Sequence, residues 1–284
     1  MIKHVSVIIP VFNDPKGIRK ALGALTNQSY DSRFFEIFVV DNGSTDETLS
    51  VVKQFICQFP DLIQIVNENK KQGSYAARNA GIKIVKGNLI AFTDSDCIPE
   101  FNWLERGVEA FKIQKHSVAA GHIEMFFSHS KPNVWEYYDA SHNLNQESYV
   151  KNYGFGTTAN LFVLKKLFDR YGLFLDNLKS GGDYEFCRRM VKGGEQIDYL
   201  NDAVVRHPAR STLRSILKKN KRVAKGQKEL KRLNLLDHNQ INRRNFIPSK
   251  TVPHLKNKST SLQFQILLIV TKNILKYHNL INRI

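Results

Sequence analysis

The chain has 284 residues, 42% of them hydrophobic and 24% charged, which is the balance of a folded globular protein and not of a disordered one. Its three cysteines lie far apart in the sequence, which argues against a disulfide framework or a cysteine-based metal site and favours a reducing compartment. No apolar run reaches the roughly 18 residues of a membrane-spanning helix. We expect no secretory signal peptide, because Pro10 breaks the apolar run near the start.

The net charge of +16 is concentrated near the carboxyl end of the chain. Residues 206–284 hold 19 Lys and Arg against only Glu229 and Asp237, a balance of +17. Subtracting these from the totals leaves 23 basic and 24 acidic residues before residue 206, a balance of −1. Such asymmetry predicts an anionic partner for the basic tail, either a membrane surface or nucleic acid.

Strand and helix patterns alternate through the first hundred residues. We expect strands at residues 5–10, where Pro10 would end the strand, and then at 35–40, 62–66 and 89–93. Between them we expect helices that begin at Asp14-Pro15, at Thr45 and at Gly73, the last one reaching Val85 with Ile84 on its packed side. This alternation favours a mainly parallel sheet covered by helices.

The second half of the chain is less regular. The patterns predict helices at residues 103–115 and from Asp183 onward, and an irregular region with one short helix at 126–153. They predict strands at residues 117–123 and 161–164, and two short ones at 197–200 and 203–205.

Polar side chains follow three of the expected strands: Asn13 and Asp14, then Asp41, then Asp94 and Asp96. In open α/β sheets, ligands bind beyond the carboxyl ends of the strands. Asp94 and Asp96 are separated by one residue, so on an extended chain they point the same way, and Mg²⁺ and Mn²⁺ prefer such carboxylate oxygens. These residues therefore predict a metal–diphosphate site, with turn or helix-cap roles as the alternative for each aspartate.

Six motifs, in their order along the chain, resemble those of the second family of glycosyltransferases, which has the GT-A fold. They occupy residues 7–13, 39–46, 73–81, 94–96, 158–172 and 182–185, within a region of resemblance over residues 4–207. One departure is Gly182, where many members of that family have an acidic residue, although Asp183 beside it is retained.

The resemblance implies transfer of a sugar from a nucleotide-diphosphate sugar, a UDP-sugar by preference, with inversion at the anomeric carbon and with Mg²⁺ or Mn²⁺ as cofactor. It implies that Asp183 is the general base and that Asp96 and His207 bind the metal. It assigns nucleotide-sugar binding to Pro10, Val11, Phe12, Asn13, Asp41, Gly73, Arg78, Asp94 and Ser95. The alternatives are a turn role for Asp41, a surface ion pair for Arg78, a helix N-cap for Asp183 and a structural role for His207.

The expected organisation is a GT-A catalytic domain over residues 1–207, with a nucleotide-binding half at 1–98 and an acceptor-binding half at 99–207, followed by a basic helical extension at 208–284. Apolar residues recur at helical spacing within the Lys/Arg-rich residues 211–235, which predicts a basic amphipathic helix. Helices of this kind can lie on anionic membranes. We expect a cytoplasmic protein whose tail, with the short apolar run 266–270, attaches it to the inner face of the cell membrane near a glycan or lipid-linked acceptor. The alternative is a tail that packs on the catalytic domain.

Other functions compete with this interpretation. A nucleotidyltransferase of related fold would need a glycine-rich, basic loop after the first strand, and Pro10 to Asp14 stand there instead. A non-catalytic nucleic-acid or membrane-binding protein is the alternative that the tail suggests. We expect no nucleic-acid partner, because zinc-ligand spacings and aromatic–glycine RNA motifs are missing from the sequence. A silent glycan-binding relative is the remaining alternative.

Overall fold

The computed structural model describes residues 4–113, 116–142, 144–236, 269–271 and 273–274, and the structural statements below concern these residues. Contacts between residues divide the chain into two compact units. Unit 1 comprises residues 1–124, 145–177 and 182–207, and unit 2 comprises residues 125–144, 178–181 and 208–284. Unit 2 thus takes two segments from within the expected catalytic region. The functional division at residue 207 stays a prediction.

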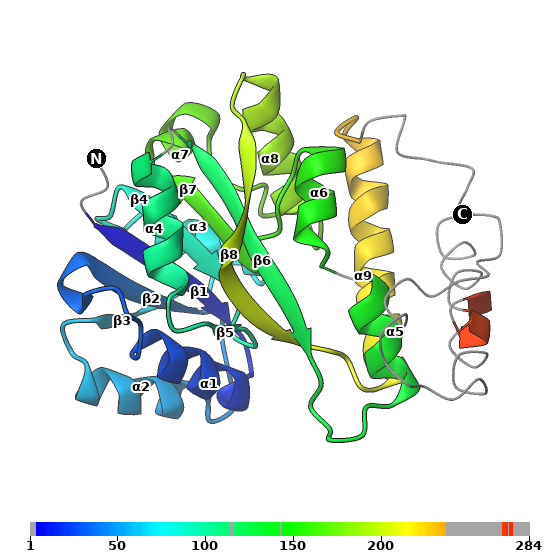
Figure 1. The fold of residues 1–284 in the computed structure, drawn as a ribbon, viewed down its shortest axis with the longest axis horizontal. Helices are drawn as coiled ribbons and strands as arrows, with labels where there is room; N and C mark the ends of the chain where they lie inside the picture. The colour runs from blue at the N-terminus through cyan, green and yellow to red at the C-terminus, as the bar shows by residue number, and fades with distance from the viewer. Residues whose placement is uncertain (1–3, 114–115, 143, 237–268, 272, 275–284) are drawn as a thin grey trace. The chain divides into compact units, whose positions relative to one another are not determined.

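The first half of unit 1 is built from parallel strands alternating with helices (Figure 1). The strands are β1 (Val5–Val11), β2 (Phe35–Asp41), β3 (Ile63–Asn67) and β4 (Leu89–Thr93). The helices are α1 (Pro15–Leu25), α2 (Thr48–Gln58) and α3 (Ser74–Ile82). Every residue of β1, β2 and β4 is buried, as expected of strands covered on both faces. The predicted parallel α/β arrangement is confirmed here.

The second half of unit 1 completes a mixed sheet of eight strands within the described residues, in the order β3-β2-β1-β4-β7-β6-β8-β5. The added strands are β5 (Ile98–Pro99), β6 (Val118–Phe126), β7 (Asn160–Leu164) and β8 (Ile197–Pro208). β7 is antiparallel to β4 and to β6, and β5 is antiparallel to β8. The helices are α4 (Trp103–Ile113), α6 (Gln146–Tyr153), α7 (Lys166–Tyr171) and α8 (Gly182–Lys192).

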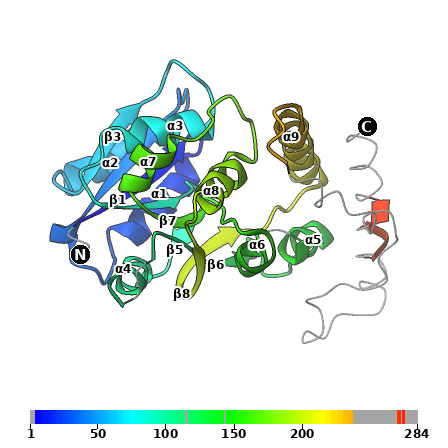
Figure 2. The same ribbon diagram turned by 90° about the horizontal axis from the view of Figure 1, so that it is seen from above.

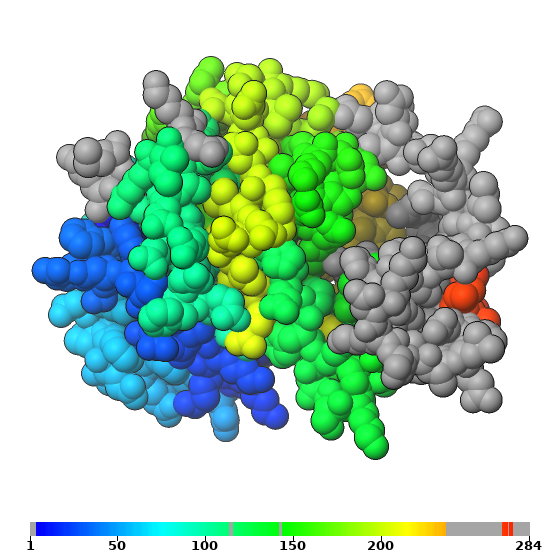
Figure 3. Space-filling view, in the orientation of Figure 1, coloured from blue at the N-terminus to red at the C-terminus, as the bar shows by residue number. Residues whose placement is uncertain are grey.

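Aromatic side chains fill both faces of this sheet. Phe162 is paired with Ala91, and its ring packs on Trp103 of α4 at 5.2 Å between centroids. Phe92, the next residue along β4, points to the opposite face and packs on Phe168 of α7 at 6.0 Å. α4 and α7 therefore cover opposite faces of the sheet (Figure 2). In the space-filling view, β8 reaches the surface of unit 1 between α4 and α6 (Figure 3).

The structure corrects several element boundaries. Pro10 does not end β1, which runs to Val11; pairing with β4 stops at Ile8, so Pro10 has a strand on one side only and its missing N–H is tolerated. The helix predicted to reach Val85 ends at Ile82, and Ile84 is 45% exposed. The two short strands predicted at 197–205 are one strand, β8, and residues 126–153 hold two helices.

Unit 2 contains α5 (Val134–His142) and α9 (Leu213–Arg232), whose contact is centred on Tyr138 and Ile216. Fully buried Asp139 accepts hydrogen bonds from the backbone N–H and Nη1 of Arg210, at 3.0 and 3.1 Å, and its other oxygen lies 3.6 Å from Nζ of Lys219. Burial lowers the pKa of Lys219 to about 8, although Asp139 opposes this.

α9 lies where the sequence predicts a basic amphipathic helix, and part of its apolar face is buried within unit 2: Ile216, Ala224, Gly226 and Leu230. Leu213 and Leu233 are each 39% exposed. Most of the predicted apolar run 266–270 lies outside the described residues. Among the described residues, every helix is too short or too polar to cross a bilayer.

Candidate active site

The loops that follow β1, β2 and β4 are tied together by side-chain hydrogen bonds. The backbone N–H of Asn13 donates to Oγ of Ser44 at 3.0 Å, and the N–H of Thr45 donates to Oδ1 of Asn13 at 2.8 Å. Asp14 caps α1 and also accepts a hydrogen bond from Oγ of Ser95 at 2.8 Å. The carboxyl ends of three strands therefore meet at one edge of the sheet, which carries the predicted residues Pro10, Val11, Phe12 and Asn13 beside Ser95.

Asp41, the last residue of β2, is 2% exposed and shapes the turn that follows it. Its carboxylate accepts hydrogen bonds from the backbone N–H groups of Gly43 at 3.0 Å and Ser44 at 3.1 Å. This is the turn role given above as the alternative. It does not exhaust the carboxylate, which has about four lone-pair positions, so a nucleotide base N–H remains a possible donor. The base-binding role of Asp41 stays a prediction.

Asn42 is a buried residue of the site region that the sequence analysis missed. Its side-chain amide donates to the carbonyls of Glu68 and Lys71, at 2.6 and 2.9 Å, and its Oδ1 accepts from the N–H of Gly73 at 2.6 Å. Gly73 precedes α3 with φ of 152°, a conformation that favours glycine. Asn42 thus fixes the start of α3 to the end of β2. The Asn-Gly pair at 42–43 signals a turn but not these long-range partners.

Arg78 and Asp94 form an ion pair between Nη2 and Oδ1. The side chain of Arg78 is only 4% exposed, so the surface ion-pair alternative for this residue is wrong. Its guanidinium lies 5.6 Å from the ring centroid of Tyr75, one helical turn earlier on α3. The contact orients Asp94 just beyond β4, next to Ser95 and Asp96.

Asp183 is the second residue of α8, whose start is Gly182. Its Oδ1 accepts hydrogen bonds from the N–H of Tyr184 at 3.0 Å and from the hydroxyl of Tyr75 at 3.2 Å. Burial raises the pKa of Asp183 above its ordinary value, and the Asp94 charge adds to this, whereas the Tyr184 N–H, Arg78 and Tyr75 oppose it. A continuous series of contacts therefore runs from Asp183 through Tyr75 and Arg78 to Asp94.

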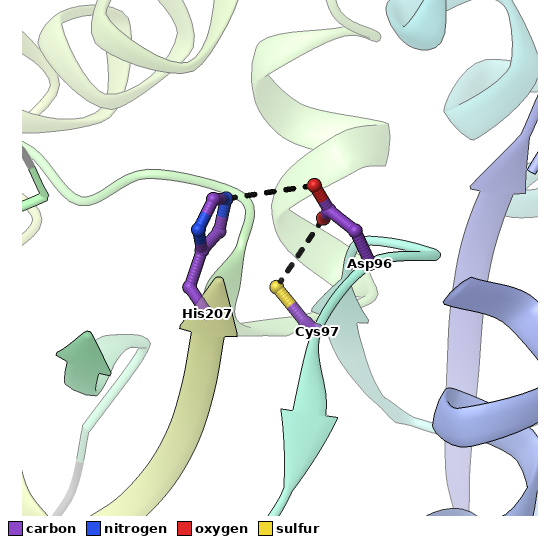
Figure 4. A group of neighbouring side chains, drawn as sticks. All are labelled: Asp96, Cys97 and His207. Carbon is purple, nitrogen blue, oxygen red and sulfur yellow. Dashed lines mark hydrogen bonds and ion pairs between the residues drawn. The ribbon is translucent and has the colours of Figure 1, made fainter. Parts of the chain in front are cut away.

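Asp96, Cys97 and His207 place donor atoms within 4.8 Å of one another (Figure 4). The pairing of Ile98 with Arg206 between β5 and β8 sets this arrangement, because it brings the residues at 97 and 207 side by side. Nε2 of His207 lies 3.8 Å from Oδ2 of Asp96.

The donor set of this cluster fits a divalent cation. A carboxylate and an imidazole suit Mn²⁺, and Mg²⁺ is often held by one or two carboxylates together with substrate phosphates. The Asp96 side chain is 44% exposed, so its oxygens are accessible to a ligand. Cys97 is buried, which raises the pKa of its thiol well above the ordinary value, and sulfur is a soft donor that suits Mg²⁺ and Mn²⁺ less well than oxygen does. We regard Asp96 and His207 as the candidate metal ligands.

The sequence profile described as Glycosyl transferase family 2 matches residues 6–172, more than half of the chain. The chain belongs to this family. Glycosyltransferase AglE of Haloferax volcanii is 38% identical over 223 residues, which cover 78% of this chain and 72% of AglE. A dolichyl N-acetyl-alpha-D-glucosaminyl phosphate 3-beta-D-2,3-diacetamido-2,3-dideoxy-beta-D-glucuronosyltransferase of Methanococcus voltae is 27% identical, covering 75% of this chain and 70% of that protein.

Solved glycosyltransferases share the fold of this family 2 member. Mannosyltransferase PcManGT of Pyrobaculum calidifontis, solved with GDP-Man and Mn²⁺, has a TM-score of 0.63 and 19% identity, covering 81% of this chain. TarS 1-349 of S. aureus, solved with UDP, has a TM-score of 0.56 and 20% identity, covering 78% of this chain. This chain spans 64% of the length of each of those two chains.

The GT-A fold predicted from the motifs is confirmed by these neighbours, and the predicted family is confirmed by the profile match. As a family 2 glycosyltransferase, the protein transfers a sugar from a nucleotide-sugar donor. Membership in this family sets aside the nucleotidyltransferase alternative. The roles of individual site residues stay predictions.

Proposed function

We propose that this glycosyltransferase moves a sugar, with inversion, from a nucleoside-diphosphate sugar to a hydroxyl group of a lipid-linked or growing glycan. The observation that supports this proposal most directly is the series of contacts from Asp183 through Tyr75 and Arg78 to Asp94. It ties a carboxylate of raised pKa to the acidic loop beyond β4, where Asp96 and His207 would bind the metal.

In this mechanism the acceptor hydroxyl attacks the anomeric carbon of the donor sugar on the face opposite the diphosphate. Its oxygen forms the new glycosidic bond, its proton passes to the Asp183 carboxylate, and the electrons of the breaking bond leave with the diphosphate. A base with a raised pKa holds this proton better than an ordinary aspartate would. A divalent ion, when bound by Asp96 and His207, would supply positive charge at the departing diphosphate. Arg78 keeps Asp94 in position beside this site.

For the donor we propose a UDP-sugar as the first choice. The buried carboxylate of Asp41 can accept a hydrogen bond from a ring N–H of the base, which uracil carries at N3 and guanine at N1, whereas the N–H groups of cytosine are on its exocyclic amine. The solved relatives support both possibilities, because TarS was solved with UDP and PcManGT with GDP-Man. A panel of UDP-, GDP- and CDP-sugars therefore tests the role of Asp41 together with the choice of donor.

For the acceptor we propose a sugar carried on a lipid phosphate, reached from the inner face of the membrane. Two observations support this choice. The relative from Methanococcus voltae is described as acting on a dolichyl phosphate-linked sugar. The basic helix α9 carries nine Lys or Arg and one acidic residue, a composition that favours an anionic lipid surface.

The test is a panel of nucleotide sugars with Mg²⁺ or Mn²⁺, scored by release of nucleoside diphosphate and by transfer to the acceptor. Asp183→Asn should lower kcat by about 100-fold or more, the usual contribution of a general base, while the Kd for the donor stays within about threefold. Asp176→Asn, which removes an exposed carboxylate of unit 1 paired with Lys71, is the matched control and should keep full activity. Turnover retained in Asp183→Asn would remove this residue as the base.

A further inference from the structure

Tyr75 and Gly182 fit together next to the proposed base. The hydroxyl of Tyr75, on α3, donates to Oδ1 of Asp183, and its ring lies against the first residue of α8. A Cβ atom added to Gly182 would come within 2.8 Å of that ring, closer than real Cβ contacts. The ring is held in this place by Phe174, at 5.7 Å between centroids, and by the guanidinium of Arg78. A side chain at residue 182 is therefore incompatible with Tyr75 in its present position.

This contact accounts for the glycine directly before Asp183. The space next to Asp183 is occupied by the ring of Tyr75 from α3, and the hydroxyl group of this ring donates to the Asp183 carboxylate. Asp183 thus receives a side-chain hydrogen bond from a residue 108 positions earlier in the sequence, in addition to the backbone N–H of the adjacent Tyr184.

We propose that Tyr75 is a positioning residue that holds the Asp183 carboxylate for proton abstraction, and that Gly182 is required to admit its ring. This inference rests on the proposed function, since it assumes that Asp183 is the base. Tyr75 is suited to the task because it is 6% exposed, and because only one torsion angle of its side chain beyond χ1 has to be fixed.

The electrostatic surroundings fix the direction of the hydrogen bond. Burial and the neighbouring Asp183 charge raise the pKa of Tyr75 far above its ordinary value, so its hydroxyl stays protonated and acts as the donor. The groups facing Asp183 are Tyr75 and Arg78 from α3, Asp94 from the loop after β4, and Cys187 one turn along α8. The Tyr75 hydroxyl and Arg78 favour the ionised carboxylate, whereas Asp94 disfavours it.

The test is the pH dependence of kcat in Tyr75→Phe, which keeps the ring and removes the hydroxyl. Losing this donor raises the pKa of Asp183, so the acidic limb of the profile should move to higher pH by about one pH unit. On that limb kcat should fall about tenfold, the difference should close at high pH, and the donor KM should stay within about twofold. Gly182→Ala, which displaces the ring, should move the limb in the same direction.

Tyr171→Phe is the matched control. The Tyr171 hydroxyl, at the last residue of α7, also donates to a carboxylate at 3.2 Å, but this carboxylate is that of Glu195 and not that of Asp183. Its pH profile should equal that of the wild type. A limb that stays in place in Tyr75→Phe, or a kcat that falls equally at every pH, would overturn the positioning role. Failure of the proposed function would differ: the wild type would release no nucleoside diphosphate, or Asp183→Asn would remain active.

Discussion

Cys97 stands between the two residues that we propose as metal ligands, and its sulfur lies 3.9 Å from Oδ1 of Asp96. Distance alone would make it a third ligand. Its chemistry argues otherwise, because the hard ions Mg²⁺ and Mn²⁺ prefer oxygen and imidazole donors to the soft sulfur of a thiol. The contribution of each of the three residues to metal binding can be measured separately.

We predict that Asp96→Asn and His207→Ala each weaken Mn²⁺ binding, measured as thermal stabilisation in the presence of UDP, by about tenfold or more. Cys97→Ser, which removes the sulfur and keeps a group of similar size, should change the Mn²⁺ midpoint by less than about twofold. Activity after chelation should recover on adding Mn²⁺ to Cys97→Ser but not to Asp96→Asn. Equal weakening by Cys97→Ser and Asp96→Asn would make the thiol a ligand.

Among single residues, those of the site that could be predicted from the sequence are the ones recognisable from their own type and their immediate neighbours in the chain. Asp94, Asp96 and Asp183 follow predicted strands or begin a predicted helix, so their types and positions indicate a site. Tyr75 and Asn42 were missed because their partners come from distant segments. From the sequence alone, a tyrosine on a helix is most simply interpreted as a core residue. Only the fold shows that α8 packs against Tyr75. Their roles follow from packing and not from any local pattern.

Among the secondary-structure elements, α4 packs so closely on the sheet that its residue 107 has to be a glycine. A Cβ atom on Gly107 would lie 2.3 Å from the ring of Phe162 on β7, a ring that also packs on Trp103. Gly23, on the exposed side of α1, has nothing within 4 Å of the same added atom. The two glycines therefore make a matched pair.

We predict that Gly107→Ala lowers the free energy of unfolding by about 1–3 kcal/mol, because the added methyl group overpacks the contact between α4 and β7. Gly23→Ala should raise it by about 0.5–1 kcal/mol, because alanine is the better helix former and meets no neighbour. Urea unfolding of both variants at one pH measures the difference. Equal effects in the two variants would show that helix propensity alone, and not packing on Phe162, decides the cost at residue 107.

Helices and strands were predicted well where burial produces a clear apolar pattern in the sequence, as in β1, β2 and β4. β8 was predicted as two strands because its residues 198–202 alternate poorly: Asp198, Asn201 and Asp202 interrupt the apolar pattern. They nevertheless belong to one continuous strand, whose neighbours in the sheet are β6 and β5. Residues 126–153 gave a weak signal because their apolar pattern is short: α5 packs through a small cluster around Tyr138 and also holds Arg210 through Asp139, and the buried residue of α6 is the polar Gln146.

On the scale of the whole molecule, charge separates the basic tail from a near-neutral body. Structure accounts for only part of the tail, because one side of α9 is buried in unit 2 while Lys218, Lys221 and Lys225 are exposed. Ile216 and Leu230 are buried in the protein, so their apolar side chains are not available to insert into a bilayer. The proposed binding to a membrane would therefore come mainly from charge.

We predict that reversing Lys218, Lys221 and Lys225 to glutamate lowers partition onto anionic vesicles by about tenfold or more, since each basic residue contributes on the order of 1 kcal/mol near such a surface. The matched control reverses three exposed lysines of unit 1, Lys20, Lys53 and Lys83, for the same change in net charge. Cosedimentation with vesicles at low and physiological salt measures both. Equal losses in the two triple variants would mean that net charge, and not α9, directs binding.

Residues 178–181, which come just before α8 in the chain, pack against α9 within unit 2. The carbonyl oxygen of Ser180 lies so close to Gly226 that an added Cβ atom would come within 2.4 Å of it, and Leu230 lies against Gly181. Two residues further along the chain stands Asp183. α9 therefore packs against the segment that comes directly before α8 in the chain, and a shortened version of this enzyme that omits residues 208–232 would lose these contacts together with the tail.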